Sequence, residues 1–454
     1  MKTYLASSIA LGALLSLAQP AAAQKTAACP VKIGITLPLS GSLASVAKAA
    51  SESANLAVEH VNAGGGVKGC PIQLVVRDDQ NQPNVGVDAA KYMAEVERVS
   101  LITGALTSSI VGAVLTAVAV PNKLPLVSSC ASAETFTKMA EEGRTNGMFF
   151  RLYATVRTQA AGGAKATIDA GYKNVAIIYP TNDLGTGVAT NYTRVLESLG
   201  GKVVAAVPFN ENQPSYRAEV NQLLAAKPDA LVIVAFVQDG ATITREWLSL
   251  GGTQNLILHN GVRSKEYVRA VGAKFLEKAI GFDSAAVPGP GVDSFTKAYQ
   301  AKYNTAPNGP CILPQYDAIV VSSLAMNIAP DLSGTAIRDS MRKIQDPNGT
   351  VIGTGPAAYA QALALIKEGK PIKYVGATGT VEFDRNGDVT GPTLCGTSAM
   401  ASLAWRRPTR RGRSPPFSRK APSSRAGRGD RFCAVSRLRD VGSVPVALDA
   451  GLSR

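Results

Sequence analysis

The chain of 454 residues has little of the material from which metal centres and membrane spans are built. It contains two histidines, two tryptophans and six cysteines, and no two cysteines follow a Cys-x-x-Cys spacing. A structural zinc site uses about four closely spaced Cys or His ligands, so none is expected. After residue 23 no stretch approaches the ~18 apolar residues of a membrane-spanning helix. Neither the Gly-x-Ser-x-Gly elbow of hydrolases nor a P-loop occurs, which argues against an enzyme.

Residues 1–23 are typical of a cleavable export signal. Lys2 gives the positive start, Leu5–Leu17 is an apolar run broken only by small residues, and three alanines end the segment at Ala23. The run is too short to cross a membrane. We therefore exclude it from the fold and expect a periplasmic protein whose mature chain begins near Gln24.

The net charge of +14 is distributed unevenly. Residues 395–454 hold twelve Arg and one Lys against three Asp, a net charge of +10, so the rest of the chain carries +4. Three interpretations of this tail are open: a basic arm for nucleic acid or membrane, a disordered extension, or the product of a shifted reading frame. The Arg, Pro, Ser, Gly and Ala content favours the third, and we assign the tail no function and no nucleic-acid partner.

Two cysteines each stand immediately before a proline and a β-rich apolar run. These are Cys29 and Cys70. If the two strands are neighbours in a sheet, their starts lie side by side, and a disulfide between these cysteines is expected. Pairing of Cys130 with Cys311 is a second, weaker expectation.

Short apolar runs alternate with helical patterns through most of the chain. Val31–Leu37 predicts a strand, Ala44–Asn62 a helix and Ile72–Arg77 the next strand, and a second such series begins after Gly147. This alternation predicts an α/β fold with parallel sheets in two similar lobes. Ligands of such folds bind at the carboxyl ends of the strands. The loops expected there are residues 37–47, 106–109, 128–133, 180–187 and 236–240.

Hydroxyl side chains gather at two of these strand ends. Thr107, Ser108 and Ser109 end a strand and open a helix, where free N–H groups, hydroxyls and the positive helix end suit a carboxylate. Helix capping is the alternative interpretation of the same residues. The segment Ser128–Ser132 is a second small, polar strand end with the same two interpretations.

Six segments in order along the chain carry a family pattern. They read VKIGITLPLSGSLA, ANLAVEHVNAGGGVKGCPIQLVVRDDQNQPNVGVDAA, LITGALTSS, VAIIYPTNDLGTG, KPDALVIVAFVQDGATITREW and VEFDRNGDVTGP. Together they resemble the substrate-binding proteins of branched-chain amino acid ABC transporters, the leucine/isoleucine/valine-binding kind of type I periplasmic binding protein. The resemblance extends from about Val31 to Pro392 and stops where the basic tail begins.

The resemblance implies two Rossmann-like lobes with parallel sheets, joined by three hinge crossovers that close on a ligand. We place the crossings near Arg151, Phe282 and Gly379. The resulting segments are 24–150 and 283–378 for lobe 1, 151–282 and 379–394 for lobe 2, and 395–454 for the tail.

The resemblance also implies which residues bind the ligand. It places the ligand carboxylate at Ser108, the Cys130 backbone and Ser132 of lobe 1. The full set of expected ligand-binding residues is Val46, Ser108, Ser109, Cys130, Ser132, Asp183, Leu184, Phe236, Asp239 and Arg263.

Three of these positions depart from the family pattern. Val46 and Leu184 stand where leucine/valine binders carry aromatic residues, and Arg263 stands at or beside their ammonium-binding glutamate. Because a buried ammonium needs a carboxylate partner, Asp183 or Asp239 has to replace that glutamate if the ligand is an amino acid. If neither does, Arg263 favours a ligand without an amine or with a second carboxylate.

The implied function is that of a periplasmic solute-binding component of an ABC importer. It would bind an amino acid or related small carboxylate as a monomer, without cofactor or metal, and deliver it to a membrane permease. A ligand sensor of the same fold is the first alternative, and an exported hydrolase is a distant one. The sequence Thr393–Gly396 replaces a family strand, so we expect lobe 2 to lack an edge strand and to be less stable.

Overall fold

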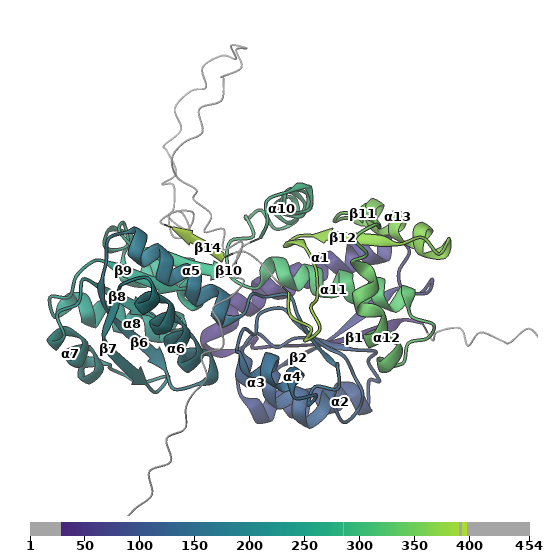
Figure 1. Ribbon diagram of the computed structural model, residues 1–454. Coiled ribbons are helices and arrows are strands. Elements are labelled where there is room, and N and C mark those ends of the chain that lie inside the picture. The colour runs from purple at the N-terminus through teal and green to yellow at the C-terminus, as the bar shows by residue number, and fades with distance from the viewer. Residues whose placement is uncertain (1–28, 285, 390–392, 397–454) are drawn as a thin grey trace, which may run out of the picture.

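The computed structural model of the protein describes residues 29–284, 286–389 and 393–396. These residues form two α/β lobes, with lobe 2 on the left of Figure 1 and lobe 1 on the right. Each lobe has a sheet of mainly parallel strands flanked by helices, as the alternating sequence pattern predicts. The expected fold class is confirmed.

Lobe 1 is built on a five-stranded parallel sheet with the order β2-β1-β3-β4-β5. Each strand before β5 is followed by a helix that crosses back over the sheet, because parallel neighbours need a long connection. A five-residue π-helical segment, Leu115–Ala119, continues α3. The elements are β1 Val31–Leu37, α1 Ala44–Ala63, β2 Ile72–Asp78, α2 Pro83–Glu95, β3 Ile102–Gly104, α3 Ser108–Val114, β4 Leu126–Ser128, α4 Thr135–Glu141 and β5 Phe149–Arg151.

Lobe 2 repeats this arrangement in a six-stranded sheet with the order β14-β10-β9-β8-β6-β7. Strands β8 and β9 are buried along their whole length because helices cover both faces of the sheet. The elements are α5 Val156–Asp169, β6 Asn174–Pro180, α6 Asp183–Ser198, β7 Lys202–Phe209, α7 Arg217–Ala225, β8 Ala230–Ile233, α8 Val237–Ser249, β9 Leu256–His259, α9 Lys265–Val271 and β10 Ile280–Ser284.

The chain then returns to lobe 1 and completes its core. Helix α11, Ile312–Ile328, is buried on almost all sides because it packs against α1, α12, α13 and the strands β3 and β4. A small sheet, β11-β12-β13, lies beyond it. The remaining elements are α10 Pro290–Tyr303, α12 Gly334–Ser340, β11 Thr350–Ile352, α13 Pro356–Lys367, β12 Ile372–Gly376, β13 Gly379–Thr380 and β14 Thr393–Gly396.

The end of the fold differs from the sequence-based expectation in two ways. Val381 and Phe383 lie in the core of lobe 1, so the chain stays in that lobe about ten residues beyond the expected crossing at Gly379. The segment Thr393–Gly396 is also an edge strand, β14, which pairs antiparallel with β10. The expectation that lobe 2 lacks an edge strand is therefore wrong, because backbone pairing along β10 does not require the family's apolar, aromatic side chains.

Both expected cysteine pairs are joined. The Cys29–Cys70 disulfide is confirmed, and it links the starts of β1 and β2, which lie side by side in the parallel register Val31 to Ile72. A second disulfide joins Cys130 to Cys311 across 181 residues of sequence.

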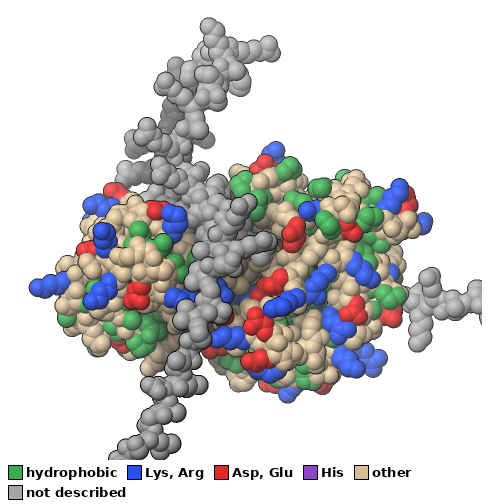
Figure 2. Space-filling model, viewed as in Figure 1, with side chains coloured by type: hydrophobic (Ala, Val, Ile, Leu, Met, Phe, Trp, Pro, Cys, Tyr) green, Lys and Arg blue, Asp and Glu red, His purple; other side chains and the backbone are tan. Residues whose placement is uncertain are grey.

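The surface in Figure 2 shows basic and acidic side chains interspersed over the described residues, in keeping with the small net charge of the chain before residue 395. Within the part of the chain that the structure describes, no helix is long and apolar enough to cross a membrane. The expected export signal, 1–23, and nearly all of the basic tail lie outside the described residues.

Candidate functional site

The strand order of each sheet predicts where a ligand binds. In lobe 1, β1 lies between β2 and β3, and in lobe 2, β6 lies between β7 and β8. At such a point the loops that follow neighbouring strands diverge to opposite faces, which opens a crevice at the carboxyl edge of the sheet. The loops after β1 and β3 therefore face the loops after β6 and β8 across the two lobes.

A pocket lies between the lobes where these loops meet, and we call it the cleft pocket. It brings together six of the ten expected residues. Three of them follow strands of lobe 1 and three are apolar, and they are Ser108, Cys130, Ser132, Val46, Leu184 and Phe236. Its lining residues are Leu43, Val46, Leu106, Thr107, Ser108, Cys130, Ser132, Leu184, Phe236, His259, Asn260, Gly261, Pro310 and Cys311.

Lobe 1 presents hydrogen-bond donors to the cleft pocket. Helix α3 begins at Ser108, and no side chain caps its start, because the Thr107 hydroxyl instead donates to the Asn81 side-chain oxygen at 2.9 Å. The capping interpretation is therefore wrong here, and the first amides of α3 remain available to an anion. Ser132 lies beside them, buried, after β4. This arrangement suits a carboxylate.

Lobe 2 presents mainly apolar surface to the same pocket. Leu184 lies in the first turn of α6, and Phe236 immediately precedes α8. His259, the last residue of β9, and Asn260, directly after it, add two polar side chains. The pocket therefore has a donor-rich wall in lobe 1 and, in lobe 2, a mainly apolar wall with one imidazole and one amide.

A smaller polar pocket adjoins the cleft pocket and shares four lining residues with it, including Ser108 and Phe236. It contains the expected residues Ser109 and Asp183, together with Glu211. Burial raises the pKa of Glu211, although the Asn182 amide donates to its carboxylate at 2.9 Å and partly offsets that effect. The acidic side chains thus lie at one end of the cleft, beyond the apolar wall.

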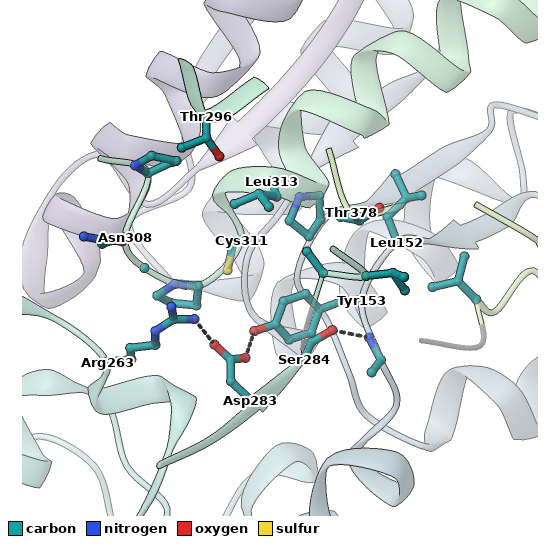
Figure 3. Close-up of a pocket in the computed structure, with 18 of the residues that line it drawn as sticks. Leu152, Tyr153, Arg263, Asp283, Ser284, Thr296, Asn308, Cys311, Leu313 and Thr378 are labelled. Atoms are coloured by element: carbon teal, nitrogen blue, oxygen red, sulfur yellow. Dashed lines mark hydrogen bonds and ion pairs between the residues drawn. The ribbon is translucent and has the colours of Figure 1, made fainter. Parts of the chain in front are cut away.

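The two remaining expected residues lie elsewhere. Asp239 is buried inside lobe 2, where its carboxylate accepts hydrogen bonds from the Tyr216 hydroxyl at 2.6 Å and the Asn212 N–H at 3.1 Å. Arg263 lines a separate cavity beside the hinge and forms an ion pair with Asp283, Nη1 to Oδ2 at 2.8 Å (Figure 3). Neither side chain lines the cleft pocket.

The hinge cavity in Figure 3 is large, about 340 Å³, and its walls include Pro310 and Cys311, which also line the cleft pocket. A cavity of this size is large enough to be a candidate ligand site. We favour the cleft pocket because the diverging loops of both sheets meet there and the uncapped start of α3 points to it. The hinge cavity lies at the crossovers, where Tyr153 and Ser284 form its wall.

Sequence reasoning missed Asn260 and Glu211. Asn260 directly follows β9, and Glu211 is the second residue after β7. The rule that ligands bind at carboxyl ends of parallel strands could have found both. Asn260 was overlooked because the expected glutamate position was placed three residues later, at Arg263.

Two lobes joined by crossovers around a shared pocket define a class, the binding proteins that close on a small ligand. The family description "Periplasmic binding protein" matches residues 30–362. The chain belongs to this family. The proteins similar to it are solute-binding proteins and not enzymes.

Similar proteins agree with this assignment. The substrate-binding protein BasB of a chemotactic signal transduction system, from Halobacterium salinarum, is 26% identical over 361 residues, covering 78% of this chain and 83% of BasB. The Leu/Ile/Val-binding protein homolog 3 of Brucella melitensis is 26% identical over 402 residues, which cover 87% of this chain and 96% of the homolog. LivJ of Streptococcus pneumoniae, solved with isoleucine, superposes with a TM-score of 0.68 at 20% identity. The superposition covers 81% of this chain and 95% of LivJ.

Proposed function

We propose that the protein is the periplasmic solute-binding component of an ABC importer. It binds an amino acid or a related small carboxylate between its lobes and delivers it to a membrane permease. The observation that carries the proposal is the meeting of Ser108 and Ser132 of lobe 1 with Leu184 and Phe236 of lobe 2 in one pocket.

The proposed chemistry follows from the two walls of the pocket. The uncapped amides of α3 and the hydroxyls of Ser108 and Ser132 hold the ligand carboxylate. Val46, Leu184 and Phe236 cover its apolar body. Because the ligand contacts both lobes, it favours the closed state over the open one, and the permease recognises that state.

The test is the thermal unfolding of the purified chain against a panel of amino acids and amine-free carboxylates. A ligand at a hundred times its Kd stabilises the folded state by about 2.7 kcal/mol, which raises the unfolding temperature by several degrees. We expect such a shift with at least one small carboxylate. The same ligand should be taken up by cells that express the permease only when this protein is present. Absence of any shift across the panel would contradict the proposal.

BasB supports a second candidate, since its name assigns it to a signalling system. In that role the closed, ligand-bound protein is presented to a signalling receptor instead of a permease. Ligand binding would then occur as described, but removal of the protein would abolish a chemotactic response and leave uptake unchanged.

A further inference from the structure

The side chain of Asn260 lies at the end of β9, between the cleft pocket and the hinge. Its amide nitrogen donates to the Tyr153 hydroxyl at 2.6 Å and to Asp283 Oδ1 at 2.8 Å, with Gln159 Oε1 at 3.5 Å. All three acceptors lie on the hinge side of Asn260. The two N–H bonds of the amide are therefore used away from the pocket.

The orientation of the Asn260 amide is fixed by neighbouring groups that can act only as hydrogen-bond donors or only as acceptors. Gln159 donates from Nε2 to the Ala154 carbonyl at 2.7 Å, and a carbonyl can only accept. Gln159 Oε1 therefore faces His259 Nε2, at 3.2 Å, and Asn260. Burial lowers the pKa of His259 to about 4, so its ring is neutral and carries its proton on Nε2 while Nδ1 accepts from the Gly261 N–H.

Asp283 fixes the amide from the other side. Its carboxylate is held by Arg263 at 2.8 Å and by the Tyr153 hydroxyl, both of which donate to it (Figure 3). An ionised carboxylate only accepts, so the group that Asn260 turns toward it is the amide nitrogen. A flipped amide would set its oxygen against the oxygens of Asp283 and Gln159.

The Asn260 carbonyl oxygen is consequently turned away from the hinge. It makes no hydrogen bond within the described residues, yet it is not among the fully buried atoms that lack a partner, so it is open to the pocket that Asn260 lines. The lining residues of the cleft pocket include no Asp or Glu. The Asn260 amide oxygen is therefore a fixed, uncharged side-chain acceptor on the lobe 2 wall.

Resting on the proposed function, we infer that Asn260 selects a carboxylate ligand bearing a hydroxyl group over the corresponding α-amino acid. The hydroxyl donates to Asn260 Oδ1 while the carboxylate lies against α3. A neutral hydroxyl is satisfied by an amide oxygen, whereas a buried ammonium without a carboxylate partner is penalised.

The experiment compares three ligands that differ in one group on the same carbon. They are 2-hydroxy-4-methylpentanoate, its deoxy form 4-methylpentanoate, and leucine, each titrated calorimetrically into the full chain. Benzoate and its hydroxybenzoates form a matched aromatic series. We expect at least one hydroxy acid to bind about 5- to 10-fold more tightly than its deoxy form, the size of one neutral hydrogen bond. Leucine should bind more weakly than the hydroxy acid by at least about 10-fold.

The Asn260→Ala variant assigns the effect to this side chain. It should bring the hydroxy and deoxy acids to within about 2-fold of each other, while Asn348→Ala, the same replacement at an exposed turn, should leave the ratio unchanged. Thermal unfolding establishes that each variant is folded.

Three results would overturn the inference. They are equal binding of hydroxy and deoxy acids in both series, leucine binding as tightly as the hydroxy acid, or a hydroxyl preference that survives Asn260→Ala. Binding of no carboxylate at all would instead overturn the proposed function, and the inference with it.

Discussion

At the scale of single residues, Asp79 is a carboxyl group buried beneath the polar end of the cleft. Its Oδ1 accepts the Asn81 N–H at 2.9 Å, but its Oδ2 has no partner, and the residue is fully buried. Burial, together with a smaller contribution from the neighbouring Asp78, raises the pKa of Asp79 to about 6, although the Asn81 N–H partly offsets that effect. The ionised form therefore destabilises the fold at neutral pH.

Asp79→Asn should stabilise the protein above pH 7 by up to about 3 kcal/mol, which is the free-energy equivalent of a pKa shift from 3.8 to about 6. The folded state binds the proton more tightly than the unfolded state does, so the stability gained from protonation is lost as pH rises through 6. The difference between variant and parent should shrink as pH falls from 6 toward 4. Denaturant unfolding at pH 8, 6 and 4 measures it, with the exposed Asp88→Asn as control. A constant difference across pH would contradict the assignment.

Single residues were also where sequence reasoning was least complete. Ser108, Ser132 and Phe236 could be predicted because each lies at the end of a recognisable strand. Arg263 could not be placed, because only the folded hinge shows that Asp283 holds its guanidinium outside the cleft pocket. Asp239 likewise required knowledge of Tyr216, 23 residues away, which holds its carboxylate inside lobe 2.

At the scale of elements, the Cys130–Cys311 disulfide joins the loop after β4 to the start of α11. Both cysteines line the cleft pocket. The other disulfide, Cys29–Cys70, lies at the amino ends of β1 and β2, on the opposite edge of the sheet from the cleft. The two bonds thus provide a matched pair, one at the candidate site and one remote from it.

Removing either disulfide by paired Cys→Ala substitutions should lower the free energy of unfolding by about 2–5 kcal/mol. Only loss of Cys130–Cys311 should also weaken ligand binding, by roughly 10-fold, because it releases the loop that carries Ser132. Calorimetric unfolding and ligand titration of the two variants measure both effects. Equal loss of affinity in both variants would show that the effect is one of general stability.

Elements were the best-predicted level of the molecule. The strand Val31–Leu37 has the expected bounds, and most other strands and helices match within a few residues, because buried parallel strands read as short apolar runs. Strand β14 was missed because its pairing depends on backbone hydrogen bonds to β10, which side-chain pattern does not reveal.

At the scale of the whole molecule, the two lobes touch across the cleft. Glu134 of lobe 1 accepts a hydrogen bond from the Asn191 amide at 3.1 Å and pairs with Arg157, both from lobe 2. Burial would raise the pKa of Glu134, but these two donors outweigh it and lower that pKa. These contacts exist only when the lobes are close, so they favour closure.

Glu134→Ala should therefore reduce apparent ligand affinity by about 3- to 10-fold, since an ion pair of this kind contributes about 1 kcal/mol to the closed state. The stability of the separate lobes should change little. Small-angle scattering should show a smaller radius of gyration on ligand addition in the parent protein and a higher ligand concentration for the same change in the variant. Glu142→Ala, which removes an ion pair within lobe 1, is the control. Identical titration curves would show that Glu134 does not contribute to closure.

The central claim is that one small carboxylate binds between the lobes against Ser108 and Ser132. The most direct measurement is isothermal titration of the carboxylate that gives the largest thermal shift into the parent protein, into the Ser108→Ala/Ser132→Ala variant and into the exposed Ser249→Ala control. We expect one ligand per chain and an affinity lowered at least about 10-fold by the double substitution alone. Unchanged affinity in the double variant would place the carboxylate elsewhere and contradict the account.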